Sequence, residues 1–204
     1  EGTPRLLDSS LAGFSRQPSL VSLPDGRVLA AWPQRGRENR GGATRPHLRV
    51  SVGSADGRRW SPSLPVDPEF EGTSPFRPRA IHADGRSSLA WTTAVAGRRG
   101  RGAVVFSQST DGARTWSAPR EIFVGEEAPF AVLQSSGKHA YLSWHGGPRK
   151  DVGTYFLASA DGGTSWLAGE PTPRRLDDPL IPGNALRPSM QNDGKGRVVV
   201  VWTN

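Results

Sequence analysis

The segment Ser109-Thr-Asp-Gly-Ala-Arg-Thr-Trp116 is the most informative part of the chain, because two close copies of it occur elsewhere. Ser54-Ala-Asp-Gly-Arg-Arg-Trp60 is one residue shorter, and Ser159-Ala-Asp-Gly-Gly-Thr-Ser-Trp166 has the full length. Aspartate followed by glycine favours a tight turn capped by the carboxylate, and a large indole ring can pack between neighbouring sheets. The tryptophans of the three copies lie 56 and 50 residues apart, which indicates an internal repeat.

The four remaining tryptophans mark the same repeat at a second position, with spacings of 59, 53 and 58 residues. Each of them ends an alternating apolar run that follows a turn containing glycine, which is typical of a β-strand after a hairpin. The pattern therefore predicts four strands in each unit of about fifty-five residues. The first begins near a proline, the second ends at the strand tryptophan, the third enters the Asp-Gly turn and the fourth follows that turn. These tryptophans are Trp32, Trp91, Trp144 and Trp202.

The repeats predict an all-β fold. No segment combines a sustained helical period with capping residues, so we expect no helix longer than a turn. Four-stranded antiparallel units in tandem, each too small to bury a core alone, are typical of a β-propeller. We expect a single, partial propeller over residues 1–204 with about three and a half blades. Its repeats are expected at about 14–67, 73–124, 128–177 and 184–204, the last of them incomplete.

Both ends of the chain lie inside repeats. Thr3-Pro-Arg-Leu-Leu-Asp8 resembles Thr172-Pro-Arg-Arg-Leu-Asp177, so we expect residues 3–8 to form an outer strand of another blade. Trp202 ends a second strand, and no third strand follows it in the sequence. Two explanations remain: the chain is a fragment of a longer propeller, which we favour, or its N-terminal strand closes a ring onto the last blade.

Composition excludes several classes of protein. The chain contains no cysteine, which excludes structural zinc fingers, cysteine-bound iron–sulfur clusters and thiol catalysis. No apolar run approaches twenty residues and the mean hydropathy is −0.51, so we expect no transmembrane helix. We expect no cofactor, because no phosphate-binding glycine loop precedes a helix. We expect no metal either, because the histidines are scattered over different repeats: His47, His82, His139 and His145.

The repeated Ser-x-Asp-x-Gly-x-Thr-Trp phrase resembles the Asp box, or bacterial neuraminidase repeat, of the sialidase superfamily. The copy ending at Trp116 has the serine, aspartate, threonine and tryptophan of the phrase, whereas the third copy has Ser165 in place of threonine and the first is one residue short. The resemblance implies a sialidase-like propeller in which each box is a turn between the third and fourth strands. It therefore implies structural rather than catalytic roles for Asp56, Trp60, Asp111, Trp116, Asp161 and Trp166.

A second resemblance lies near the N-terminus. Phe14-Ser-Arg16-Gln-Pro18 is similar to the Phe/Tyr-Arg-Ile-Pro segment that opens the first sialidase blade, although one residue is inserted and glutamine replaces isoleucine. In that family the arginine binds the substrate carboxylate. Related patterns occur at Arg77-Pro78 and Arg187-Pro188, so Arg16, Arg77 and Arg187 are candidate ligand-binding residues. Their recurrence is equally compatible with a structural element at the start of each blade.

The positive charge is concentrated in the loops between second and third strands. Arginine supplies 23 of the 26 positive residues, and the net charge is +7. Loops Pro33 to Pro46, Thr93 to Gly102 and His145 to Val152 carry +3, +3 and +1, and the rest of the chain is neutral. Because a meander reverses at each turn, these loops share a face with the three candidate arginines and lie opposite the Asp-Gly turns. Arg98 and Arg149 in these loops are therefore further ligand candidates.

A basic face of this kind favours an anionic ligand, because the guanidinium group binds planar anions with two parallel hydrogen bonds. An acidic glycan is the favoured partner, and an acidic protein surface or plain solvated charge are the alternatives. Nucleic acid is disfavoured, because the chain has no recognition motif and its tryptophans occupy repeat positions.

The sequence leaves enzymatic activity open. A sialidase-type reaction needs an arginine cluster, a tyrosine activated by glutamate, and an acid. Glu38 and Asp151 are weak candidates for the acid, while Tyr141 and Tyr155 both fall within strands of the third repeat. Two functions remain open. The first is a glycan-binding propeller, which includes the case of a degenerate or partial exo-sialidase-like hydrolase. The second is a non-catalytic scaffold for protein interaction in an exported complex. The lack of cysteine and the resemblance both fit an exported bacterial protein, periplasmic or extracellular.

Overall fold

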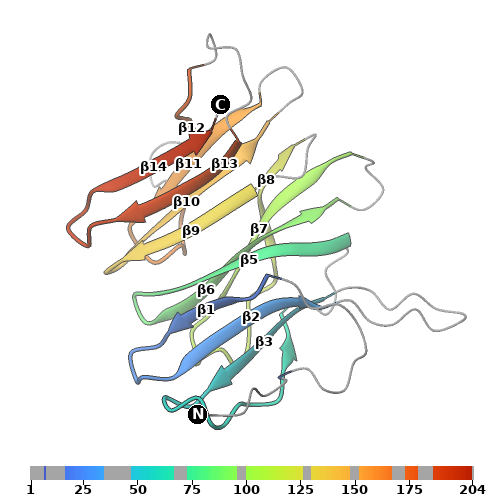
Figure 1. Ribbon diagram of the computed structural model, residues 1–204, viewed down its shortest axis with the longest axis vertical. Coiled ribbons are helices and arrows are strands. Elements are labelled where there is room, and N and C mark those ends of the chain that lie inside the picture. Colours follow the sequence, from blue (N-terminus) through green and yellow to red (C-terminus); the bar gives the residue numbers. More distant parts are fainter. Residues whose placement is uncertain are drawn as a thin grey trace, which may run out of the picture.

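The computed structural model describes residues 7, 17–34, 47–66, 73–95, 100–125, 130–147, 152–166, 173–178 and 186–203. Every regular element among these residues is a β-strand. The strands form three four-stranded sheets and one two-stranded sheet, and every pairing is antiparallel. Figure 1 shows the first three sheets following one another along the long axis of the molecule, and the fourth sheet lies beside the third. The expected all-β architecture of consecutive four-stranded propeller blades is confirmed.

Within each sheet the strands are ordered as in the sequence, so each pairs with the next along the chain. The first sheet contains β1 Ser19–Ser22, β2 Val28–Gln34, β3 His47–Gly53 and β4 Leu64–Pro65. The second contains β5 Thr73–Ala83, β6 Arg86–Ala94, β7 Gly102–Ser109 and β8 Arg120–Gly125. The third contains β9 Phe130–Ser136, β10 His139–Gly146, β11 Gly153–Ser159 and β12 Arg174–Arg175. The fourth contains β13 Leu186–Asn192 and β14 Val198–Thr203.

The first strands of successive sheets contact one another: β1 lies against β5, β5 against β9 and β9 against β13. Three hydrogen bonds join them. The backbone N–H of Ala80 donates to Ser19 Oγ at 2.9 Å, and Ser135 Oγ donates to the carbonyl oxygen of His82 at 3.3 Å. The amide of Asn192 donates to the carbonyl oxygen of Ser135 at 3.1 Å. The first strands therefore form a continuous inner wall, as expected for the strands that surround a propeller axis.

Apolar side chains fill the space between neighbouring sheets. One cluster joins the first two sheets and includes Val50, Trp91 and Ala113. A second joins the second and third sheets and includes Phe106 and Trp144. Each large side chain removed from water in this way contributes about 1.5 to 3 kcal/mol. The sheets thus stabilise one another in pairs, which is why a single unit could not fold alone.

The three Ser-x-Asp-Gly segments form turns between the third and fourth strands of their sheets, and we call them the Asp turns (54–60, 109–116 and 159–166). In the second turn, Asp111 Oδ1 accepts hydrogen bonds from Ser109 Oγ at 2.8 Å and from the Thr115 N–H at 2.9 Å. In the third turn, Asp161 is bonded in the same way to serines at both ends of the turn. These carboxylates hold backbone and hydroxyl groups of their own turns.

The Asp turns also connect neighbouring sheets. The ring of Trp166 meets Phe106 of β7 edge-on, with centroids 5.2 Å apart. The side chain of Gln108 in β7 donates to the carbonyl oxygen of Gly162 at 2.8 Å. Trp116 packs against the first cluster in the same manner. Each of these two turns is therefore held against the preceding sheet by an aromatic ring.

The Asp turns make the stability of the fold depend on pH. Burial raises the pKa of Asp161, but hydrogen bonds from Ser159, Ser165 and Thr164 outweigh it and lower the pKa to about 2. Hydrogen bonds from Thr115 and Ser109 hold the pKa of Asp111 well below its usual range. Both carboxylates hold their protons less tightly in the folded than in the unfolded chain, so their contribution is complete above about pH 4. It is lost as the pH falls toward 2.

We expect the double variant Asp111→Asn/Asp161→Asn to unfold with a weaker dependence on pH between 4 and 2 than the wild-type chain. The measurement is urea unfolding followed by tryptophan fluorescence at several pH values. Asp84→Asn is the matched control, because this exposed aspartate belongs to a different turn and pairs with the Arg86 side chain. An unchanged dependence in the double variant would contradict the stabilising role of the Asp turns.

Candidate functional site

One structural position recurs in all four sheets. In each first strand one residue faces the tryptophan of the second strand, and the recurring position is the residue directly before it. In the third sheet, Trp144 pairs with Ala131, so Phe130 holds this position. In the other sheets the residue facing the tryptophan is a proline. The strand pairing, continued by one residue, places Pro18, Pro78 and Pro188 opposite Trp32, Trp91 and Trp202. We call the four residues at this position the inner ring: Gln17, Arg77, Phe130 and Arg187.

Three members of the inner ring have an unusual backbone. Gln17, Arg77 and Arg187 have φ angles of 50°, 48° and 52°, in the left-handed region that non-glycine residues seldom adopt. Each such conformation costs of the order of 1 to 3 kcal/mol and needs surrounding structure to hold it. The strand register shifts by one residue around Arg77 and around Arg187, so both lie at β-bulges. Phe130, by contrast, pairs regularly with His145.

Proline explains the difference between these strands. It has no N–H to donate to a neighbouring strand, so within sheets it occurs at edges, strand starts and bulges. Arg77 and Arg187 precede prolines, whereas Phe130 precedes Ala131, which can keep the regular ladder. A bulge redirects the side chain of the inserted residue. The prolines therefore determine where the two arginine side chains point.

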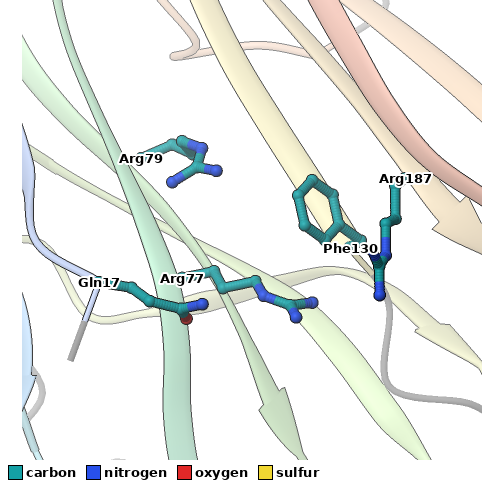
Figure 2. A pocket seen from close by; sticks show the side chains of 5 residues that line it. All are labelled: Gln17, Arg77, Arg79, Phe130 and Arg187. Carbon is teal, nitrogen blue, oxygen red and sulfur yellow. The ribbon is translucent and has the colours of Figure 1, made fainter. Parts of the chain in front are cut away.

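The inner ring and Arg79 line one pocket with a volume of about 420 Å³. Figure 2 shows the side chains of Gln17 and Arg77 extending toward Phe130 and Arg187. The Cζ atom of Arg77 lies 4.7 Å from the centre of the Phe130 ring, and that of Arg79 lies 5.9 Å from it. Arg79 Nη1 also donates to the carbonyl oxygen of Pro78 at 3.2 Å. The aromatic ring thus holds two guanidinium groups at the pocket.

The pocket is strongly electropositive. Among the described residues, no carboxylate lies within 4.0 Å of the guanidinium groups of Arg77, Arg79 or Arg187. Burial lowers the pKa of Arg79, and the neighbouring charge of Arg77 lowers it further. Both effects disfavour the cation, whereas an anion entering the pocket would favour it. A concave site lined by one sign of charge also attracts ions of the opposite sign.

The structure brings together only some of the residues that the sequence suggested. Arg77 and Arg187 line the same pocket. Gln17, and not Arg16, holds the position in the first sheet that corresponds to theirs. Five candidates lie outside the described residues, and so do most residues of the three basic loops. These five are Arg16, Arg98, Arg149, Glu38 and Asp151.

Sequence reasoning missed Gln17, Arg79 and Phe130. The signal for Phe130 is the pairing of Ala131 with Trp144, since the position is defined by register and not by the nearby proline. Neither tyrosine lines the pocket. Tyr155 is buried in the second cluster, stacked on Trp144 with centroids 5.8 Å apart, and Tyr141 stacks on Phe156 of the neighbouring strand. The described part of the pocket therefore offers groups for binding an anion and no tyrosine nucleophile.

The described residues also bear on cofactors and membranes. No group of three or more His, Asp or Glu side chains there could hold a metal ion. None of the described segments forms a helix long and apolar enough to cross a membrane.

Comparison with solved structures identifies proteins of the same fold. An α-L-arabinanase of Penicillium chrysogenum complexed with arabinobiose superposes with a TM-score of 0.69 at 14% identity, over 92% of this chain and 57% of that one. A protein of unknown function from Dyadobacter fermentans gives 0.69 at 17% identity, over 99% and 60%. A family 117 glycoside hydrolase of Zobellia galactanivorans gives 0.58 at 16% identity, over 93% and 66%. The shared property is the β-propeller fold.

These likenesses concern the fold alone, because all identities are below one fifth. The chain spans less than two thirds of the length of each of these structures. No model of a known protein family matches the sequence, and no curated protein matches it. The chain thus has a propeller fold that glycoside hydrolases also use. The sequence identities are too low to transfer an activity to it.

Proposed function

We propose that this chain belongs to an exported, sialidase-like propeller that binds an acidic glycan in the pocket of the inner ring. One observation carries the proposal: Arg77, Arg79 and Arg187 come from two different sheets and line a single pocket, without a described carboxylate to neutralise them. A guanidinium group can bind a carboxylate through two parallel hydrogen bonds. An anionic sugar would supply the missing negative charge.

The size and lining of the pocket favour a sugar over a bare inorganic anion. Its volume of about 420 Å³ falls within the range of about 300 to 1,000 Å³ that is usual for small-molecule sites. Phe130 provides an apolar surface, and Gln17 provides a neutral hydrogen-bonding group. The arabinanase of the same fold was solved with arabinobiose, so this architecture accommodates carbohydrate in at least one protein.

The described residues that line the pocket can bind an anionic sugar but provide no group for its hydrolysis. Glycoside hydrolysis requires a pair of carboxyl groups, or a tyrosine with its activating base, next to the scissile bond. None of the described residues lining the pocket is acidic or a tyrosine. If the full-length protein is a hydrolase, Glu38 and Asp151 in the basic loops are the candidates for the acid. The proposal therefore concerns recognition of the ligand.

We expect isothermal titration to show that the chain binds the α-methyl glycoside of N-acetylneuraminic acid or methyl glucuronide more tightly than methyl glucoside. Arg77→Ala and Arg187→Ala should each weaken binding of the acidic sugar about tenfold or more, because a hydrogen bond to a charged group contributes about 1.5 to 3 kcal/mol. The affinity should also fall as salt is added.

Arg27→Ala is the matched control, since it removes the same charge from the turn between β1 and β2, where Arg27 pairs with Asp25 at 2.7 Å. This variant should bind as the wild-type chain does. Equal losses in Arg27→Ala and Arg77→Ala would show that only the bulk charge matters. Absence of any preference for acidic sugars would refute the proposal and leave the alternative of a protein-interaction scaffold.

A further inference from the structure

We infer that Gln17 is the specificity-determining residue of the pocket. Building on the proposed function, this inference narrows the ligand to a sugar with one anionic group. That group would lie on the side of Arg77 and Arg187, and an uncharged hydroxyl or N-acyl group would face Gln17.

Gln17 is equivalent in position to Arg77 and Arg187. Gln17, Arg77 and Arg187 each precede a proline, share the same left-handed φ within a few degrees, and line the same pocket. Arginine holds this position in the second and fourth sheets, and glutamine holds it in the first. The chain therefore keeps the strained backbone at residue 17 for a side chain without charge. Strain of this kind clusters at ligand-binding sites, where it fixes the direction of a side chain.

Charge is unevenly distributed over the inner ring. In the order of the sheets, the inner ring reads glutamine, arginine, phenylalanine and arginine. Figure 2 shows that the guanidinium of Arg77 extends toward Phe130, with Arg187 on the far side of that ring. The Arg77 Cζ lies 4.7 Å from the centre of the Phe130 ring. Arg79 also lines the pocket, with its Cζ 5.9 Å from the same ring. Two of the four inner-ring positions are thus cationic, and Gln17 is the neutral hydrogen-bonding member of the ring.

Glutamine and arginine differ in the hydrogen bonds that they can make. A guanidinium group can only donate hydrogen bonds, whereas the carboxamide of glutamine both donates and accepts. A sugar hydroxyl or an N-acyl group can use both capacities of Gln17. A second carboxylate or sulfate there would meet the carbonyl oxygen of the amide and find no cation at position 17. Gln17 therefore favours a singly charged sugar and disfavours a polyanion.

The test compares three variants of Gln17 by isothermal titration at one salt concentration. The probes are methyl glucuronide, which carries one charge, and a sulfated glucuronide, which carries two. Gln17→Leu removes a neutral hydrogen bond, so it should weaken methyl glucuronide binding up to about tenfold. Gln17→Arg should raise the affinity for the doubly charged sugar at least about tenfold relative to the singly charged one, and Gln17→Glu should lower binding of both.

Gln191→Leu is the matched control, because Gln191 is an exposed glutamine near the far end of β13 and does not line the pocket. It should leave both affinities unchanged. Circular dichroism and the thermal midpoint establish that each variant is folded. If Gln17→Leu fails to fold, Gln17→Asn replaces it, since asparagine adopts the left-handed conformation readily and keeps an amide. Its shorter side chain should weaken methyl glucuronide binding while retaining the preference for one charge.

The possible failures are distinguishable. If the wild-type chain binds no acidic sugar, the proposed function itself is refuted. If the wild-type chain binds methyl glucuronide and Arg77→Ala weakens it, but the Gln17 variants leave the ratio of the two affinities unchanged, the pocket stands and the role of Gln17 is overturned.

Discussion

Replacement of Trp144 by alanine should lower the free energy of unfolding by about 3 to 5 kcal/mol, the usual cost of truncating a fully buried aromatic side chain. Trp144 is completely buried between the second and third sheets. Its ring contacts Phe123 and Tyr155, with centroid distances of 5.3 Å and 5.8 Å. The alanine variant would leave a cavity between two sheets that hold each other in place. Urea unfolding followed by circular dichroism measures the loss.

Two further variants separate packing from other effects. The indole N–H of Trp144 has no hydrogen-bond acceptor among the described residues, so Trp144→Phe should retain much of the stability. Leu20→Ala truncates an aliphatic side chain that is 64% exposed, and it should change stability by no more than about 0.5 kcal/mol. A loss below about 1 kcal/mol in Trp144→Ala would show that packing between the sheets does not dominate the stability of the fold.

Gly163→Ala should destabilise the third Asp turn by about 1 to 3 kcal/mol, the usual cost of overpacking. A Cβ atom at this position would lie 2.6 Å from Cζ of Phe106 and 3.2 Å from Cζ2 of Trp166. The backbone conformation alone is not the obstacle. Ala113 holds the corresponding place in the second Asp turn with a φ of 68°, and it is buried in the first cluster. The obstacle is the phenylalanine of the preceding sheet.

This explanation predicts a specific rescue. Register with the second-strand tryptophan makes Val50 the counterpart of Phe106, since they pair with Ala31 and Ala90. The double variant Gly163→Ala/Phe106→Val would therefore combine an alanine in the third Asp turn with a valine in the second sheet. Ala113 of the second Asp turn and Val50 of the first sheet form the same combination in the first cluster. Its loss of stability should be smaller than the sum of the single losses by at least about 0.5 kcal/mol, measured by a double-mutant cycle in urea. Strictly additive losses would refute the explanation.

Gly57→Ala is the control for backbone strain in the same kind of turn. Gly57 has a φ of 69°, and a Cβ atom there would meet nothing within 4 Å. Its replacement should cost only the left-handed conformation, about 1 to 2 kcal/mol, and should not be rescued by any change in the neighbouring sheet.

The sequence predicts the sheets well because its signals are local. Alternating apolar residues, an Asp-Gly turn and a terminal tryptophan recur in each unit, and each feature acts over a few residues. The pattern predicts a first strand within Pro18 to Leu23, and the structure has β1 at Ser19–Ser22. The fourth strands are less regular, since β4 and β12 have two residues each while β8 has six.

The pocket is harder to predict because it depends on register between strands. The turn between the first and second strands has five residues in the first and fourth sheets and two in the others, so the distance from a proline to the next tryptophan does not fix which residue faces the pocket. Arg16 matches a family motif by type, yet Gln17 holds the position. Phe130 follows Pro129 and belongs to no arginine–proline pattern, although pairing between Trp144 and Ala131 places it beside Arg77. Only the paired strands reveal these equivalences.

The inner ring has a consequence for how such a protein can evolve. Each sheet contributes one residue to the ring, directly before the residue that faces the buried tryptophan. Gln17 and Arg187 are exposed, and none of the four belongs to the inter-sheet clusters. A single codon change in one repeat can thus alter one corner of the pocket while the packing between sheets is kept. Duplicated repeats that begin identical could in this way acquire different ligands one position at a time.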